Sequence, residues 1–244
     1  MIPRFFPKDI NEECVAQQNY ISLVPLMWDE SDKSGYLQER AKNKGQICND
    51  AFSNEIAKHA SNQQYKTFLE IGTWNGLGST RAFSIGFAKR TDDYVFYSLE
   101  CNRDKALDAG RLYARNDKMH ILNEVIWNEE PSDFYKIFPQ CLTNSMYKHW
   151  NTVDIVNMKR CELFLERPGL PDVFDVILLD GGQFTTYHEF QLLKNRCRIL
   201  MLDDTNVDKC KLVAQEIESD PSWRVVKKAP GARHGFLIAE KMRV

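Results

Sequence analysis

This chain of 244 residues lacks the cysteine patterns and the long apolar runs that define several common classes of protein. Its seven cysteines stand singly, without a C-x-x-C pair. They are Cys14, Cys48, Cys101, Cys141, Cys161, Cys197 and Cys210. Their odd number and irregular spacing argue against a zinc site or a disulfide framework and predict free thiols. No apolar run reaches membrane-spanning length and no apolar signal segment opens the chain, so we expect a cytoplasmic protein without a membrane partner.

An excess of basic charge is missing as well. The chain has 32 basic and 34 acidic residues, which leaves a formal net charge of -2. Proteins that bind nucleic acids usually carry a basic excess, because their cations displace counterions from the phosphates. We therefore expect no nucleic-acid partner.

From residue 66 onward the sequence alternates between strand and helix patterns. Strands are predicted at 67–72, 94–99, 119–122, 174–180, 198–202, 223–227 and 236–240. Helices are predicted at 104–115, 187–195 and 207–219, with a further helical stretch that ends near residue 89. Repeated alternation of this kind predicts an α/β fold, in which helices cover both faces of a doubly wound, mostly parallel sheet. Ahead of it, residues 1–65 are polar and mixed, with one predicted helix at 50–60.

In the segment 124–172 the apolar residues follow neither a helical nor a strand period, and the segment is too long for a simple connection inside a compact domain. We expect an insert here that covers the substrate. Its aromatic residues are candidates for stacking against an acceptor, or they form a small core of the insert itself. These residues are Trp127, Tyr135, Tyr147 and Trp150.

The first strand ends in a loop that contains Gly72, Gly76 and Gly78. Glycines let the backbone turn sharply and approach a ligand closely, although a glycine-rich turn without a ligand is the alternative. The dinucleotide fingerprint G-x-G-x-x-G is not met, since Arg81 stands where its third glycine would be. In addition, Glu70 would repel a pyrophosphate, whereas its carboxylate suits a cofactor with ammonium and sulfonium groups.

Glu100 closes the second strand, where an acidic side chain can accept both hydroxyls of an adenosine ribose. The pattern Glu70-x-Gly72-x-x-x-Gly76, followed by Glu100 and by Asp180 after a buried strand, resembles the class I S-adenosylmethionine-dependent methyltransferases over about residues 66–240. The resemblance implies a Rossmann-like sheet of seven strands whose last strand is antiparallel. It also implies S-adenosylmethionine as the cofactor, bound by Glu70, Gly72, Thr73, Asn75, Gly76, Ser79, Glu100 and Asp180.

On this basis we expect a single methyltransferase domain over residues 1–244. It would consist of an N-terminal helical region at 1–65, a cofactor-binding core at 66–123 and 173–244, and the insert at 124–172 ahead of the fourth strand.

Three aspartates follow neighbouring strands: Asp180 after the fourth, and Asp203 and Asp204 after the fifth. Carboxylates this close repel one another unless a proton or a cation neutralises them, and a hard divalent ion such as Mg²⁺ is the natural partner. Asp203 and Asp204 can share an ion only if the chain leaves strand geometry between them. The set resembles the metal-dependent O-methyltransferases that act on sugars. Alternatively, Asp203 and Asp204 cap the helix that follows.

Many proteins of that branch carry a histidine or an acid shortly after the Asp-Gly step, where this chain has Gln183. The proton acceptor is therefore predicted to be Asp180 or His188. The alternative for His188 is an ordinary position on the surface of its helix.

The function expected from the sequence is a metal-assisted methyl transfer from S-adenosylmethionine to a sugar hydroxyl of a glycan or nucleotide sugar. The alternatives are a metal-free small-molecule methyltransferase and a nucleotide-binding partner subunit without catalysis. The Pro-Pro-Tyr motif of enzymes that methylate base amino groups is missing, since the chain has no Pro-Pro dipeptide. The acceptor and the oligomeric state, including a homo-oligomer, are left open.

Overall fold

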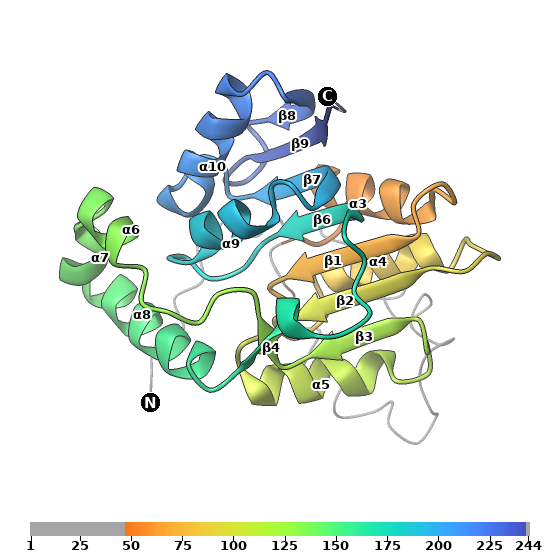
Figure 1. Cartoon of the computed structure of the whole chain (residues 1–244), viewed down its shortest axis with the longest axis horizontal. Helices are drawn as coiled ribbons and strands as arrows, with labels where there is room; N and C mark the ends of the chain where they lie inside the picture. Colours follow the sequence, from red (N-terminus) through yellow and green to blue (C-terminus); the bar gives the residue numbers. More distant parts are fainter. Residues whose placement is uncertain (1–46, 243–244) are drawn as a thin grey trace.

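The structure, a computed structural model, describes residues 47–242 (Figure 1). Most of the N-terminal region predicted at 1–65 therefore lies outside the described residues. Within it, the predicted helix at 50–60 is present as α3 (Ala51–Ser61), and Asp50 caps its first turn by accepting the backbone N–H of Ser53.

Seven strands form the main sheet, in the order β3-β2-β1-β6-β7-β9-β8. Their bounds are β1 (Thr67–Ile71), β2 (Val95–Leu99), β3 (Met119–Leu122), β6 (Phe174–Leu179), β7 (Cys197–Asp203), β8 (Trp223–Ala229) and β9 (Phe236–Lys241). Neighbouring strands from β3 to β7 are parallel, and β9 runs antiparallel to both β7 and β8. The predicted seven-stranded, doubly wound sheet with an antiparallel last strand is confirmed, and the strand positions agree with the predictions to within about two residues at each end.

Helices cover both faces of this sheet. They are α3, α4 (Ser79–Phe87), α5 (Arg103–Tyr113), α9 (Thr186–Leu193) and α10 (Asp208–Ser219). Strand side chains alternate between the two faces, as β6 illustrates: Val176 and Leu178 pack with α3 and α4, whereas Ile177 and Leu179 pack with α9 and α10. A central strand with two apolar faces has to be buried on both sides, which explains its uninterrupted apolar sequence.

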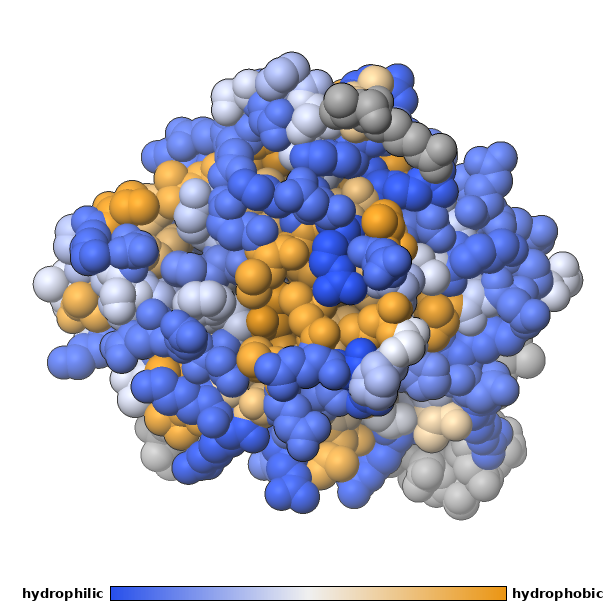
Figure 2. Space-filling model, viewed as in Figure 1, coloured by the Kyte–Doolittle hydropathy of each residue, from blue (hydrophilic) through white to orange (hydrophobic). Residues whose placement is uncertain are grey.

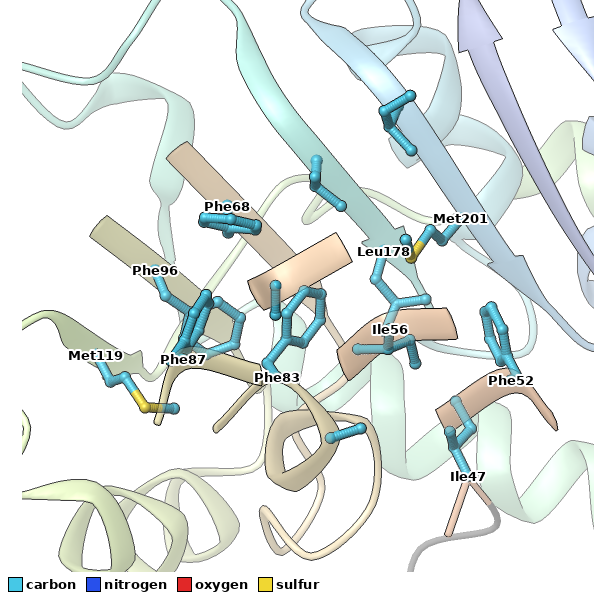
Figure 3. Close-up of a cluster of buried hydrophobic side chains, with 14 of the residues drawn as sticks. Ile47, Phe52, Ile56, Phe68, Phe83, Phe87, Phe96, Met119, Leu178 and Met201 are labelled. Atoms are coloured by element: carbon cyan, nitrogen blue, oxygen red, sulfur yellow. The ribbon is translucent and has the colours of Figure 1, made fainter. Parts of the chain in front are cut away.

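The core beneath α3, α4 and α5 is rich in aromatic rings, as Figure 3 shows. Phe68, Phe83, Phe87 and Phe96 lie with ring centroids 4.9–6.1 Å apart, in edge-to-face, tilted and stacked arrangements. Such pairs stabilise a core beyond their apolar area alone. This layer fixes the strands whose ends carry the candidate site.

Helices α3 and α4 approach each other closely at Gly86. A Cβ added to Gly86 would lie 2.4 Å from the carbonyl oxygen of Ala57 and 2.5 Å from the Cβ of Ala60. Only a glycine allows this helix contact. At the end of α4, the buried guanidinium of Arg90 donates to the carbonyls of Ala60, Asn62 and Tyr65 and so ties α3 to the start of β1.

The insert at 124–172 is largely helical, although its sequence has no helical period. It contains β4 (Glu124–Val125), α6 (Ser132–Ile137), α7 (Gln140–Thr143), α8 (Ser145–Met158) and β5 (Glu162–Leu163). Figure 1 shows α6, α7 and α8 at the end of the sheet toward which the arrows of β1, β2 and β6 point. The insert therefore stands at the carboxyl edge of the parallel strands.

The aromatic residues of the insert mostly form its own small cores. Tyr135 and Tyr147 pack against Phe184, and Trp127 packs on the cluster of Val125, Met158 and Cys161. Trp150 is exposed.

On the face seen in Figure 1, hydrophobic residues gather over the central strands and hydrophilic residues surround them (Figure 2). Within residues 47–242, no helix combines the length and the apolar character that a membrane span requires. The five cysteines whose side chains are described are free thiols, as predicted.

Candidate active site

The strand order reverses between β1 and β6, so the loops after these two strands diverge and leave room for a ligand at the carboxyl edge. The predicted acidic site residues lie in the last positions of β1 and β7 or directly after β2, β6 and β7, and these strands are neighbours in the sheet. The topology thus brings all of the predicted acidic residues, Glu70, Glu100 and the three aspartates, to one region.

Gly72 and Gly76 both have positive φ angles, +99° and +75°. A Cβ on Gly72 would lie 2.2 Å from the carbonyl oxygen of Asp180, and one on Gly76 would lie 3.0 Å from Ala109 and from the ring of Tyr113. Gly72 is therefore required by the close approach of the Asp180 backbone, and Gly76 by its positive φ and its contacts with side chains of α5. The loop after β1 packs against the end of β6, which fixes its position at the carboxyl edge of the sheet.

Glu70 lies fully buried beneath this loop. Its Oε2 accepts hydrogen bonds from the hydroxyls of Thr80 and Ser98, and its Oε1 has no partner. Burial raises the pKa of Glu70 to about 7, against the lowering effect of its hydroxyl partners. An orphaned acceptor on a buried carboxylate marks a place where a ligand or a bound water can donate.

Thr73, Asn75 and Ser79 are each buried. The hydroxyl of Thr73 bonds to Ser98 of β2, and Asn75 accepts the backbone N–H of Leu77. These side chains hold the shape of the loop, and their direct contact with a cofactor stays a prediction.

Glu100 stands at the end of β2, opposite the glycine loop. Its Oε2 accepts the backbone N–H of Trp74 at 2.7 Å, and its Oε1 accepts that of Asn102 at 2.9 Å. Oε2 keeps a second acceptor position, whereas the second position of Oε1 faces the thiol of Cys101, a weak donor at 3.8 Å that a hydroxyl can displace. Burial raises the pKa of Glu100 to about 7.

Asp180, Asp203 and Asp204 converge, with one carboxylate oxygen from each lying within 4.8 Å of the others. Asp204 has a φ of +57°, which is left-handed, so the chain leaves strand geometry directly after Asp203. This turn is the condition under which two successive aspartates can face the same centre. Oδ1 of Asp204 is buried and has no partner in the described part of the chain.

Two cations already face these carboxylates. Nζ of Lys209 lies 2.7 Å from Asp180 and 3.2 Å from Asp204, and Arg233 donates to Asp203 at 2.6 Å. Burial and the neighbouring carboxylates raise the pKa values of Asp180 and Asp203, whereas the cations oppose this. With three carboxylates ionised, the cluster carries a net charge of -1, so one further cation is compatible with it.

The alternative that Asp203 and Asp204 cap the following helix is wrong. The N-cap of α10 is Val207, and no side chain caps that helix. The physical reason is the turn at Asp204, which directs its carboxylate toward Lys209 and away from the free amides of α10.

His188 lies in α9 and stacks on Trp127 of the insert, with ring centroids 4.7 Å apart. Its pKa is lowered by partial burial, and the charges that oppose this are those of Asp133 and Glu129. Among the described residues, its ring and charge contacts are with the insert and with Tyr187, not with the three aspartates. A role for His188 as the proton acceptor stays a prediction.

Sequence reasoning missed Asp154, Glu189, Lys209 and Arg233. Lys209 had a usable signal, because it falls in the first turn of the helix after Asp204 and so close to the strand end. Arg233 lies in the β8–β9 connection and Asp154 in the insert, where nothing in the local pattern indicates a contact with the site.

Comparisons with known proteins agree with this architecture. No protein-family profile matches the sequence, and no curated protein sequence does. Among solved structures, a proposed O-methyltransferase from Klebsiella pneumoniae has a TM-score of 0.57 at 16% identity, covering 95% of this chain and 98% of its own. An O-methyltransferase from Bacillus cereus has a TM-score of 0.55 at 16% identity, covering 94% and 99%. The O-methyltransferase TomG from Streptomyces achromogenes has a TM-score of 0.53 at 15% identity, and the match covers 92% of this chain and 95% of TomG. The chain therefore has the Rossmann-like α/β fold of these methyltransferases.

Proposed function

We propose that this protein is an S-adenosylmethionine-dependent O-methyltransferase. The observation that carries the proposal is the meeting of three features at the β1/β6 switch point: the glycine loop over Glu70, the oriented carboxylate of Glu100, and the cluster of Asp180, Asp203 and Asp204. Two structures with the same fold support it, since the Bacillus cereus protein was solved with S-adenosylhomocysteine and TomG with S-adenosylmethionine.

The residues that would hold this cofactor follow from its chemistry. Oε2 of Glu100 has an open acceptor position for one ribose hydroxyl, and the other hydroxyl would displace the weak thiol donor of Cys101 from Oε1. The loop at Gly72 and Gly76 offers a close backbone surface for the methionine part. When bound, S-adenosylmethionine supplies an electrophilic methyl group on a cationic sulfur. The surrounding carboxylates favour a cationic ligand, whereas they would repel the pyrophosphate of a dinucleotide.

We further propose that the three aspartates hold a divalent ion such as Mg²⁺. The charge of the cluster, the turn at Asp204 and the unpartnered Oδ1 of that residue support the fit. A bound ion of this kind supplies Lewis acidity to an acceptor hydroxyl. Lys209 has to give up at least part of its contact with Asp180 and Asp204 when such an ion binds. The same contact favours the second candidate, a metal-free methyltransferase in which Lys209 is the cation of the site.

For the acceptor we propose a sugar hydroxyl of a glycan or nucleotide sugar, covered by the insert. Its proton would pass to Asp180, which stands beside the glycine loop, or to His188 at the boundary with the insert. The helices of the insert at the carboxyl edge of the sheet support a covering role.

Calorimetry with the purified full chain tests the cofactor. S-adenosylmethionine should bind and NAD should not. The opposite result would overturn the proposal as a whole.

Formation of S-adenosylhomocysteine over a panel of nucleotide sugars and free glycans tests the reaction. In excess EDTA, turnover should stop while cofactor binding persists, because the ion serves the acceptor and not the adenosine. Asp203→Asn and Asp204→Asn should each lower turnover and raise the Mg²⁺ concentration required. Full activity in EDTA would select the metal-free candidate and leave the cofactor proposal intact.

A further inference from the structure

The insert brings one acidic side chain to the site, Asp154 on α8. Its Oδ2 would lie 3.7 Å from a Cβ added to Gly182, two residues after Asp180. The carboxylate therefore faces the loop after β6 at the position left open by the glycine. This contact is between segments far apart in the chain, and it places an acidic group of the insert at the carboxyl edge of the sheet.

Titratable groups from three other parts of the fold interact electrostatically with Asp154. Glu100 and Cys101 approach it from the end of β2, Glu189 from α9 and Lys209 from α10, and His149 belongs to its own helix. Asp154 thus interacts both with the carboxylate proposed for the ribose and with the lysine that contacts Asp180 and Asp204.

Asp154 differs from the other carboxylates of this region because it has no hydrogen bond or ion pair with any residue in the described range 47–242. Glu100 accepts two backbone amides, Glu189 accepts the hydroxyl of Thr185, and the three aspartates bind Lys209 or Arg233. Partial burial of a carboxylate without a partner is costly, so a cationic ligand at this point would be stabilised.

We propose that Asp154 lies beside the cationic sulfur of bound S-adenosylmethionine and makes the site prefer this cofactor over its product. The inference rests on the proposed function. With the ribose at Glu100 and the transferred methyl group directed at the aspartates, the sulfur would fall between them. Asp154 interacts with Glu100 on the ribose side and with Lys209 on the aspartate side, and its carboxylate lies beside Gly182, two residues after Asp180.

The preference follows from the charges of the two compounds. S-adenosylmethionine and S-adenosylhomocysteine share the adenosine, the ammonium and the carboxylate, and they differ in the methyl group with the positive charge on sulfur. A carboxylate near that sulfur attracts the first compound and has little effect on the second. The insert would then promote release of the product without any movement being required.

Calorimetry on the full chain at pH 8 tests this, with S-adenosylmethionine and S-adenosylhomocysteine as the two probes. At that pH Asp154 is ionised, since burial raises its pKa only to about 6. In Asp154→Asn we expect S-adenosylmethionine to bind about tenfold more weakly, with less than a twofold change for S-adenosylhomocysteine. Asp133→Asn is the matched control, because Asp133 lies in the same insert but is exposed and pairs with Lys136.

The affinity for S-adenosylhomocysteine also reports whether the variant is folded. An unchanged ratio of the two affinities, whether neither affinity falls or both fall by the same factor, would show the inference to be wrong. If turnover fell while both affinities held, Asp154 would serve the acceptor instead. Failure of the proposed function looks different, since the unaltered protein would then bind neither compound.

Discussion

Glu100 is held by two backbone amides, so its carboxylate is in place before a ligand arrives. We expect Glu100→Ala to lower the affinity for S-adenosylmethionine by roughly 10- to 150-fold, which corresponds to about 1.5–3 kcal/mol for a pair of charge-assisted hydrogen bonds. The affinity for S-adenosylhomocysteine should fall by the same factor, because its ribose is identical. Calorimetry at pH 8 measures both, with the exposed Glu130→Ala as control. An unaltered affinity would remove Glu100 from the cofactor site.

Lys209 is a buried cation between two carboxylates. Lys209→Met should lower the free energy of unfolding by about 3 kcal/mol in EDTA, because Asp180 and Asp204 lose their counter-charge. Mg²⁺ should then restore stability more in the variant than in the unaltered protein. Urea denaturation with and without Mg²⁺ measures this. Lys228→Met, which breaks an exposed pair with Glu218, should change stability by less than about 1 kcal/mol. An equal effect of Mg²⁺ on both proteins would argue against the ion site.

At the residue scale, the sequence was informative where a side chain follows a strand directly. Glu70, Glu100 and the three aspartates belong to this class, because parallel topology alone brings strand ends together. Asp154 and Arg233 reach the site from remote segments, and such contacts depend on how the insert and the last hairpin fold back. No local pattern encodes them.

At the element scale, the contact of α3 with α4 depends on Gly86. Gly86→Ala should lower the free energy of unfolding by about 1–3 kcal/mol, because the added methyl group overlaps Ala57 and Ala60 and separates the helices. Gly110→Ala is the matched control, since Gly110 is also helical and has open space around it. That variant should gain about 0.5–1 kcal/mol from the better helix propensity of alanine. Urea denaturation measures the free energy of unfolding of both variants. Equal values would mean that α3 and α4 do not pack closely at Gly86.

The elements of the core were predictable because apolar residues form continuous runs in the buried strands and recur at helical spacing in the helices, whereas the apolar residues of the insert do neither. On α8, Met146, Trp150, Val153 and Val156 are exposed and Met158 is buried. A helix whose apolar residues are not collected on one buried face leaves no periodic pattern in the sequence. Its existence follows from contacts within the insert and from the cap that Asn144 supplies.

At the scale of the whole molecule, the buried acids make stability depend on pH. Burial raises the pKa of Glu189 to about 7, against the hydrogen bond from Thr185 and the charge of Lys209. Because the folded protein holds this proton more tightly than the unfolded chain, its contribution is present below pH 4.5 and is lost as the pH rises through 7. The contribution is on the order of 3 kcal/mol.

Between pH 5 and pH 8, the free energy of unfolding should therefore fall more steeply in the unaltered protein than in Glu189→Gln, which cannot ionise there. Urea denaturation across this range measures the difference between the two proteins, in which the contributions of Glu70 and Glu100 cancel. If the free energy of unfolding changed with pH by the same amount in both proteins, Glu189 would not be protonated in the folded state.

Arg233 joins three distant parts of the chain, since it contacts Asp203 at the end of β7 and Asp50 at the start of α3 from the connection between β8 and β9. During synthesis it leaves the ribosome after every other charged group of the site. Once residues up to 220 have emerged from the ribosome, β1, β2, β3, β6 and β7 can pair, but the aspartate cluster lacks one of its two cations. The charge balance of the site is thus completed only when the hairpin of β8 and β9 docks, so the site depends on a segment that is synthesised after all five parallel strands.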